Sequence, residues 1–404
     1  MTRISLYLMF AAALLALTTG ADWRQFRGND GSSTSADTNV PLRWSAEENI
    51  AWKADLPGRA ASGPIVVKGR VIVLASSGVK QDRLHVLCID ARSGKRRWHR
   101  QFWATGRTLT HPQSAVSANT PASDGERIFA FYSSNDLICL DLDGNLLWYR
   151  GLAHDYPKAG NDVGMAASPV VVGKTVVVQI ENQGDSFAAG INTETGETRW
   201  RIKRAARANW CSPISLAGAG AKQDAVLLQS GSGLVAVDAY SGKELWTYKS
   251  DCQTITSSVA KGGRLYVPSG GIKALRIGSS AAPAKLLWKS AQLNPGAASP
   301  VVGDHEIYVA NRAGVVTCAD LASGKVLWKQ RFKGPFWATP VLAGNHLYLV
   351  NFDGQAQVVT AGRGGGKLVS TNELGEEIQG SPAVADGALY VRNHKSLWKI
   401  AKER

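Results

Sequence analysis

The chain has 404 residues, among them 42 Gly and 13 Trp, and carries a formal net charge of +14. This length alone is typical of two or three domains, but the Gly and Trp content suits short strands joined by tight turns. The basic residues are spread along the chain without a nucleic-acid-binding module, so nucleic acid is excluded as the expected partner.

Residues 1–21 are predicted to be a signal peptide. Arg3 precedes an apolar run over residues 4–17, and small residues stand directly before Asp22. The run is short for a membrane span, although an uncleaved anchor remains an alternative. No Cys follows it, so the mature chain is expected to be exported without a lipid anchor, soluble in the periplasm or outside the cell.

Residues 22–42 precede the first repeat and are expected to pack on the rest of the fold. They carry Trp23, Arg24, Phe26 and Arg27. Two arrangements are open for this segment, a packed N-terminal tail and a strap that lies across one face.

The remainder, residues 43–404, repeats with a period of about 45 residues, which is typical of the four-stranded blades of a β-propeller. One Trp lies near the end of each copy at spacings of 40 to 52 residues, and Leu368 stands where an eighth would fall. The recurring residues are Trp52, Trp98, Trp148, Trp200, Trp246, Trp288 and Trp328.

Each copy is predicted to contain four strands, the first of which usually follows a Ser/Thr-Pro pair. An Asp-x-x-Ser/Thr-Gly turn joins the third and fourth strands, and the Trp follows eight residues after the Asp. The Asp can cap the turn, and the Gly supplies the positive φ that it needs. The clearest turns contain Asp90 with Gly94, Asp238 with Gly242, and Asp320 with Gly324.

The two chain ends predict how the ring closes. The last copy has strands at 382–385, 388–392 and 397–400 but no fourth strand. Residues 49–56, with Trp52, form a fourth strand that has no copy of its own. Pairing the two removes an exposed edge and predicts an all-β, eight-bladed propeller with four-stranded antiparallel blades.

Five Cys residues leave at least one thiol unpaired in a monomer. Cys88, Cys139 and Cys318 share one position of the repeat and are expected to be buried apolar residues. Cys211 and Cys252 lie in neighbouring repeats, so a disulfide between them stays open as an alternative.

Loops that converge at one end of a propeller usually carry its function. The sequence offers no catalytic set, but it offers polar residues in these loops. The expected partner-binding rim comprises His111, Gln113, Asn311, Arg312, Asn351, Asp353 and His394. Glu181, Asn182 and Asp185 are the best candidates for binding a cation, because carboxylate and amide oxygens suit Ca²⁺. Basic residues are denser over residues 199–207, so an anionic surface is a further possible partner.

The Ala-x-Asp-x-x-Ser/Thr-Gly-x-x-x-Trp element resembles the tryptophan-docking motif of the pyrroloquinoline-quinone-like (PQQ-like) propeller repeat family. The resemblance covers nearly all of residues 43–404. It implies one of two kinds of relative, the outer-membrane β-barrel assembly factor, which binds no cofactor, or the quinoprotein dehydrogenases. The chain resembles the assembly factor more in size. It lacks the adjacent Cys pair, the large inserted loops and the CxxCH haem site found among the dehydrogenases.

The resemblance implies a monomeric, non-catalytic scaffold at the cell envelope that takes no cofactor. Its partners would be envelope or outer-membrane proteins, or an extended peptide. The alternative is an oxidoreductase that uses PQQ and Ca²⁺ on alcohols or sugars. In that case Trp210 or Trp337 would lie under the planar quinone, and Arg312 would pair with a quinone carboxylate.

Overall fold

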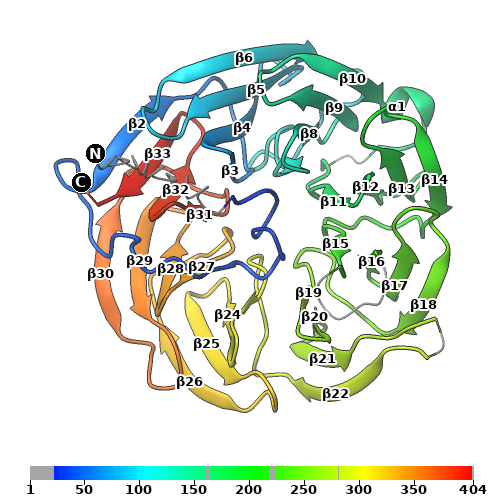
Figure 1. Cartoon of the computed structure of the whole chain (residues 1–404). Helices are drawn as coiled ribbons and strands as arrows, with labels where there is room; N and C mark the ends of the chain where they lie inside the picture. The colour runs from blue at the N-terminus through cyan, green and yellow to red at the C-terminus, as the bar shows by residue number, and fades with distance from the viewer. Residues whose placement is uncertain (1–21, 161–162, 218–223, 281, 403–404) are drawn as a thin grey trace, which may run out of the picture.

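A computed structural model describes residues 22–160, 163–217, 224–280 and 282–402, and the predicted signal peptide lies outside them. Eight sheets surround a central axis, with the first strand of each sheet innermost and the fourth on the circumference (Figure 1). The predicted eight-bladed propeller is therefore confirmed. The first and second strands of each blade join at one end of the ring. The second and third join at the other end, where the chain also passes between blades.

The eight blades follow the chain in order, with one short helix, α1 (Leu152–Asp155), between the second and third. The strands are β3 (Ile65–Val67), β4 (Arg70–Ser77), β5 (Arg83–Asp90), β6 (Arg96–Trp103); β7 (Ala122–Ser123), β8 (Arg127–Phe131), β9 (Asp136–Asp141), β10 (Leu146–Gly151); β11 (Val170–Val172), β12 (Thr175–Ile180), β13 (Phe187–Asn192), β14 (Thr198–Lys203); β15 (Ile214–Ser215), β16 (Ala225–Ser230), β17 (Gly233–Asp238), β18 (Glu244–Lys249); β19 (Val259–Lys261), β20 (Arg264–Pro268), β21 (Ile272–Arg276), β22 (Lys285–Ser290); β23 (Val301–Val302), β24 (Glu306–Ala310), β25 (Val315–Asp320), β26 (Val326–Arg331); β27 (Val341–Ala343), β28 (His346–Val350), β29 (Gln355–Thr360), β30 (Leu368–Glu373); and β31 (Ala383–Ala385), β32 (Ala388–Arg392), β33 (Ser396–Ala401), β2 (Ile50–Asp55).

The ring closes between the two ends of the chain, as the sequence predicts. Strand β2 pairs antiparallel with β33, from Ile50 opposite Ile400 to Asp55 opposite Ser396. An additional strand, β1 (Thr34–Ser35), pairs in parallel with β27 and gives the seventh blade five strands. The N-terminal region thus contributes to two blades that are otherwise built from the last quarter of the chain.

Six of the seven recurring Trp residues are seen to link their blade to the next one. The indole of Trp200 donates from Nε1 to the backbone oxygen of Ala239 (2.9 Å) in the following blade, where it packs on Gly242. Five other Trp residues make the same pair of contacts. Their hydrogen bonds run from Trp52 to Ala91, from Trp98 to Leu142, from Trp148 to Thr193, from Trp288 to Leu321 and from Trp328 to Gly362. Indole burial between sheets is therefore the contact that sets adjacent blades side by side.

Three of the turns that receive an indole, in the first, fourth and sixth blades, are held by an Asp. Oδ1 of Asp90 accepts hydrogen bonds from the backbone N–H (2.8 Å) and the hydroxyl (2.9 Å) of Ser93, and Asp238 and Asp320 bind Ser241 and Ser323 in the same way. Although partial burial opposes ionisation, these bonds and the Arg97 guanidinium hold the pKa of Asp90 below its usual range.

The seventh blade departs from the repeat. Pairing places Ser370, not Leu368, at the docking position, because Ser370 opposes Val358 just as Trp328 opposes Cys318. Leu368 is exposed instead. The Ser370 hydroxyl donates to the backbone oxygen of Leu42, and the nearby Trp44 is buried in the core cluster of the closing blades. The N-terminal segment therefore covers a blade whose own fourth strand lacks an indole.

All five Cys residues are free thiols, so the alternative of a disulfide between Cys211 and Cys252 is not realised. Cys88, Cys139, Cys211 and Cys318 are buried. Burial raises the pKa of Cys88 to about 12, so this thiol is un-ionised at neutral pH.

The contact between indole and glycine can be tested with two glycines of the first blade that share a φ of +71°. A Cβ at Gly94 would lie 2.6 Å from Cγ of Trp52, whereas a Cβ at Gly69 would meet nothing within 4 Å. Gly69→Ala should cost about 1–2 kcal/mol for the left-handed backbone alone. Gly94→Ala should cost about 1–3 kcal/mol more, because it also displaces the closing indole. Chemical denaturation of both variants measures the difference, and equal losses would contradict indole docking as the closing contact.

Candidate functional site

A cavity of about 570 Å³ opens on the axis, at the end of the ring where the chain passes between blades. Its mouth is formed by inter-blade loops and by the loop between β24 and β25. The side chains there that can recognise a ligand are His111, Gln113, Trp210, Arg312, Trp337 and Gln379. This volume lies within the range of ligand-binding pockets.

Deeper in the cavity, Ser and Thr side chains from successive blades form a hydrogen-bonded ring. Each stands just before the first strand of its blade, and its hydroxyl oxygen accepts the N–H of the equivalent residue in the preceding blade at 2.9–3.1 Å. The hydroxyls belong to Thr120, Ser168, Ser212, Ser257, Ser299, Thr339 and Ser381.

The ring is interrupted between the last blade and the first. Gly63 occupies the eighth equivalent position and has no hydroxyl to accept from Ser381. A Cβ on Gly63 would lie 2.4 Å from the backbone oxygen of Ser381, and one on Gly380 would lie 2.4 Å from that of Ser62. Glycine is required here because the two backbones approach more closely than a side chain permits.

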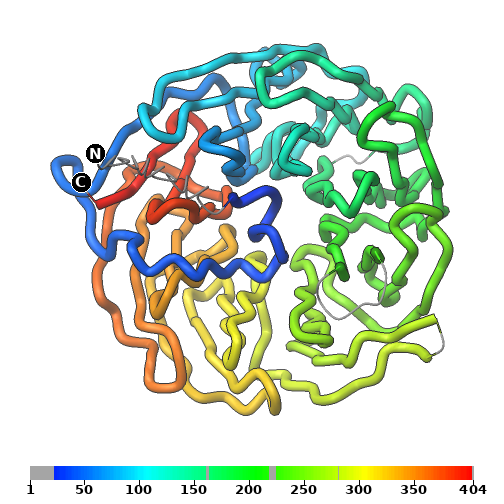
Figure 2. Tube along the Cα trace, viewed as in Figure 1, coloured from blue at the N-terminus to red at the C-terminus, as the bar shows by residue number. Residues whose placement is uncertain are grey.

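The N-terminal segment crosses the axis at the other end of this cavity, where the dark-blue chain runs through the centre of Figure 2. Trp23 exchanges two backbone hydrogen bonds with Val66 of the first blade, and Ser32 accepts one from Val302 of the sixth. Phe26 lines the axial cavity from this side. The segment therefore closes the cavity at its inner end.

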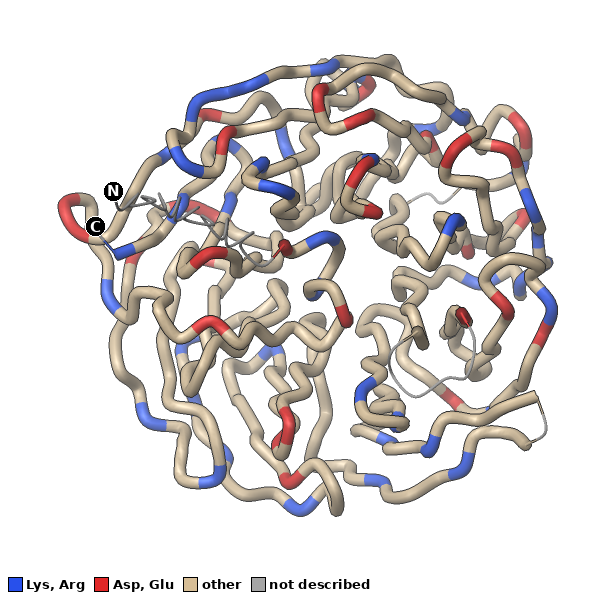
Figure 3. The backbone as a smooth tube through the Cα atoms, viewed as in Figure 1, with Lys and Arg blue, Asp and Glu red and all other residues tan. Residues whose placement is uncertain are grey.

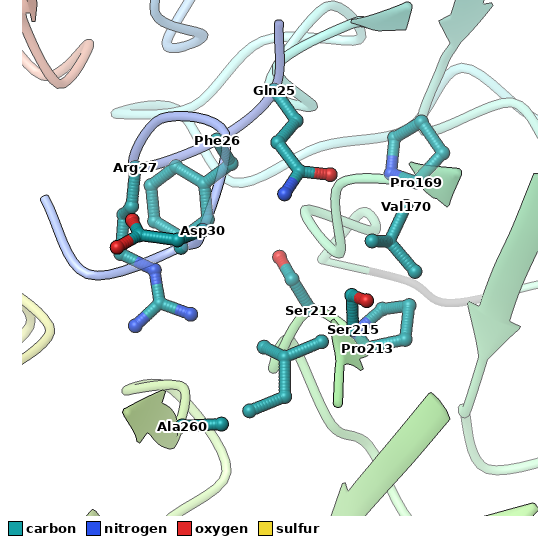
Figure 4. A pocket seen from close by; sticks show the side chains of 12 residues that line it. Gln25, Phe26, Arg27, Asp30, Pro169, Val170, Ser212, Pro213, Ser215 and Ala260 are labelled. Atoms are coloured by element: carbon teal, nitrogen blue, oxygen red, sulfur yellow. The ribbon is translucent and has the colours of Figure 1, made fainter. Parts of the chain in front are cut away.

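Arg27 enters the ring from the same segment and is buried. It donates to the backbone oxygens of Ser258 (2.9 Å) and Ser257 (3.5 Å), and its Nε has no acceptor among the described residues. Burial lowers its pKa to about 10, so the guanidinium remains charged at neutral pH. Figure 4 shows Phe26, Arg27 and Asp30 around a small cavity of about 20 Å³, the size of one water molecule.

The structure brings together five of the residues proposed from sequence. Trp210, Arg312, Trp337, His111 and Gln113 all line the axial cavity. The guanidinium carbon of Arg312 lies 4.9 Å from the centre of the Trp337 ring, and Trp210 donates from Nε1 to the backbone oxygen of Gly164 (2.8 Å).

The other rim candidates do not line the cavity. Asn311 and Asn351 accept backbone N–H groups four residues ahead, from Val315 and Gln355, and so brace their own turns. His394 lies on the backbone of Ala60, 2.9 Å from its oxygen, and Asp353 is exposed.

The two carboxylates among the proposed calcium ligands are engaged with Arg side chains. Glu181 is buried and accepts from Arg204 at 2.6 Å, while Asp185 pairs with Arg201 at 2.6 Å. Burial raises the pKa of Glu181 in spite of Arg204. No group of three or more His, Cys, Asp or Glu in the described part of the chain is arranged to hold a metal ion, so calcium binding stays a prediction.

The basic run at 199–207 is partly neutralised by these same contacts. Besides Arg201 and Arg204, Arg199 lies over the ring of Tyr240 at 4.4 Å. Figure 3 shows Lys and Arg distributed around the circumference rather than gathered on one side. The anionic surface therefore stays an untested prediction.

Sequence reasoning kept open that the segment with Phe26 and Arg27 lies across one face, but it did not count these residues as part of the site. Phe26 and Arg27 reach the axis through a turn in which Arg27 and Gly28 both have positive φ, a conformation that the sequence alone did not indicate. The hydroxyl ring did leave a signal, because Ser/Thr-Pro recurs at the start of most blades. That pair was interpreted only as the start of a strand.

One family of known proteins matches most of the chain. The family described as outer membrane protein assembly factor BamB matches residues 42–186, 104–269 and 276–364. No curated protein matches the chain by sequence.

Solved structures share the fold at low sequence identity. BamB from Moraxella catarrhalis is 16% identical, with a TM-score of 0.64 over 89% of this chain and 99% of that one. Quinohemoprotein alcohol dehydrogenase from Comamonas testosteroni is 13% identical, with a TM-score of 0.65 over 95% of this chain and 81% of that one. A europium-containing methanol dehydrogenase is 14% identical, with a TM-score of 0.63 over 93% and 90%. These likenesses establish the fold.

The interruption of the hydroxyl ring can be tested by restoring the repeat. Gly63→Ser supplies the missing hydroxyl, yet it should destabilise the protein by about 1–3 kcal/mol, because its Cβ would collide with the backbone of Ser381. Gly364→Ser is the matched control, since a Cβ there meets nothing within 4 Å, and it should change stability by less than about 0.5 kcal/mol. Denaturation midpoints compare the two, and a stabilised Gly63→Ser variant would show that the gap is not steric.

Proposed function

The chain belongs to the family described as outer membrane protein assembly factor BamB, and from this premise we propose that it is a non-catalytic scaffold of the cell envelope. Its partners are extended segments of envelope or outer-membrane proteins, which dock around the mouth of the axial cavity. The sequence supports export through its predicted signal peptide. Within the described ranges, no helix combines the length and apolar character needed to cross a bilayer.

The observation that carries the proposal is a set of large apolar side chains exposed at the end of the ring where the cavity opens. Val79 is completely exposed and Trp103 is 60% exposed, and Leu109 is more than half exposed. Val163 and Ile255 are also exposed and line the cavity. Exposed apolar side chains grouped around a groove are typical of a surface that binds another protein.

The first blade raises part of this rim above the rest. Strands β4, β5 and β6 have eight residues each, against five or six in the corresponding strands of the other blades. The additional residues lie at the mouth end and include Trp103, which pairs with Arg83. Because a strand rises about 3.3 Å per residue, two additional residues extend this edge of the blade by about 7 Å. A raised edge beside an apolar mouth can guide an extended chain.

This scaffold role can be tested by site-specific photocrosslinking in the envelope fraction of the source organism. A benzophenone side chain at Trp103 or Val163 should form adducts with envelope proteins, because Val163 lines the cavity and Trp103 lies on the outer strand of the first blade at the same end of the ring. The control position is Tyr240, which is 66% exposed but lies in the turn between β17 and β18 at the opposite end of the ring. Equal adducts at all three positions, or none at the mouth, would contradict docking there.

A second candidate function is the binding of PQQ, which when bound can accept a hydride from an alcohol or sugar. Its support is that Trp210, Arg312 and Trp337 converge on one cavity. The fit is incomplete, because no Asp or Glu among the described residues lines this cavity to hold Ca²⁺ beside the quinone. The scaffold therefore remains the better supported function.

Thermal melting separates the two candidates. Addition of PQQ with Ca²⁺ should leave the melting temperature unchanged if the cavity takes no quinone. A ligand at about 100 times its Kd would add about 2.7 kcal/mol and raise the melting temperature by a few degrees. Such a rise, together with reduction of an artificial electron acceptor, would favour the oxidoreductase.

A further inference from the structure

The hydroxyl ring of the axial cavity presents hydrogen-bond donors that the protein itself does not use. Each oxygen accepts one backbone N–H, but none of the seven hydroxyl hydrogens has an acceptor among the described residues. Six of the seven residues are at least nine-tenths buried, and all line the cavity. A Ser or Thr hydroxyl that already accepts one bond still has one hydrogen to donate. The ring is therefore suited to a ligand rich in acceptor oxygens.

The charges around the cavity select the sign of the ligand. The described residues that line it include Arg312 but no Asp or Glu. Arg27 places a further buried guanidinium against the backbone of Ser257 and Ser258, and it has no carboxylate within ion-pair distance in the described part of the chain. Donors and cations without acidic groups favour a neutral or anionic ligand over a cation.

The inner end of the cavity is closed. Phe26 lies at this end, and the segment that carries it is bonded to the first blade through Trp23 and to the sixth through Ser32. Because this segment lies across the axis, we expect a chain that enters from the mouth to enter by one of its ends. An N-terminal ammonium would meet the positive charge of Arg27 and Arg312, with no carboxylate among the described lining residues to offset it. A C-terminal carboxylate carries the opposite charge and can accept hydrogen bonds from the hydroxyl ring.

We propose that the cavity receives the free C-terminal end of an extended partner peptide. The α-carboxylate accepts hydrogen bonds from part of the hydroxyl ring, under the positive charge of Arg312 and Arg27. The side chains just before the carboxylate pack against Trp210 and Trp337 at the mouth. This assignment rests on the proposed scaffold function and names the part of the partner that enters the ring.

The test uses the purified protein and two pools of degenerate hexapeptides labelled with fluorescein at the N-terminus. One pool ends in a free carboxylate, and the other ends in a carboxamide, which removes the negative charge but keeps the side chains. Retention on immobilised protein should favour the acid pool by about tenfold or more, because hydrogen bonds to a charged group are replaced by bonds to a neutral one. Equal retention, or no retention of either pool, would overturn the proposal.

Two sets of variants assign the effect to the cavity. Ser212→Ala with Ser299→Ala removes two ring hydroxyls and should abolish the preference for the acid pool. Ser212→Thr with Ser299→Thr should retain it, because Thr120 and Thr339 already serve in the same ring. Should the Ala pair unfold, Arg312→Gln provides an independent reading and should reduce the preference. Its control is Arg276→Gln, an exposed Arg at the end of β21 that lies away from the cavity.

The outcome is separable from that of the scaffold proposal. Loss of the acid preference with rim adducts still formed at Trp103 and Val163 would overturn the chain-end assignment alone. Absence of those adducts would contradict the scaffold itself, whatever the peptide pools show.

Discussion

The packing of an indole on a glycine of the next blade is the contact on which the ring depends. In the turn that receives each indole, glycine serves two needs at once. It adopts the positive φ of the turn, and it leaves room for an aromatic ring at a distance that no Cβ could tolerate, as Gly242 does for Trp200. Because the contact always runs from one blade to the next, it orders the sheets around a circle rather than stacking them. The hydrogen bond from Nε1 then fixes the rotation of each indole.

The N-terminal segment performs two tasks that are physically connected. Strand β2 closes the ring on β33, and the residues that precede it run along the seventh blade and across the axis. Trp44 covers the blade that has Ser370 at its docking position, and Phe26 closes the inner end of the cavity. The same stretch of chain therefore completes the fold and lies across the inner end of the axial cavity.

This arrangement gives the molecule a functional direction. The mouth combines apolar side chains such as Val163 with the Arg312 and Trp337 pair, while the interior presents hydroxyl groups. A gradient from apolar at the mouth to hydrogen-bond donors at the closed end suits a ligand with a polar tip and an apolar body. The raised edge at Trp103 extends the apolar part of the gradient outward over the first blade. The scaffold and chain-end proposals both follow from this polarity.

The blade count and the closure could be predicted from the amino-acid sequence. The eight-residue interval from Asp90 to Trp98 recurs because turn and docking contact are local, and the unpaired strand around Trp52 left only one place to join. It also brought forward Trp210, Arg312 and Trp337, which lie in loops that a propeller necessarily directs to one end. The roles of Arg27 and Glu181 became clear only from the folded structure. Arg27 binds the backbone of Ser258, which lies far along the chain, and Glu181 pairs with Arg204, to which no spacing rule connects it. The hydroxyl ring likewise exists only once eight blade starts meet around one axis, since each bond joins residues about 40 to 57 positions apart.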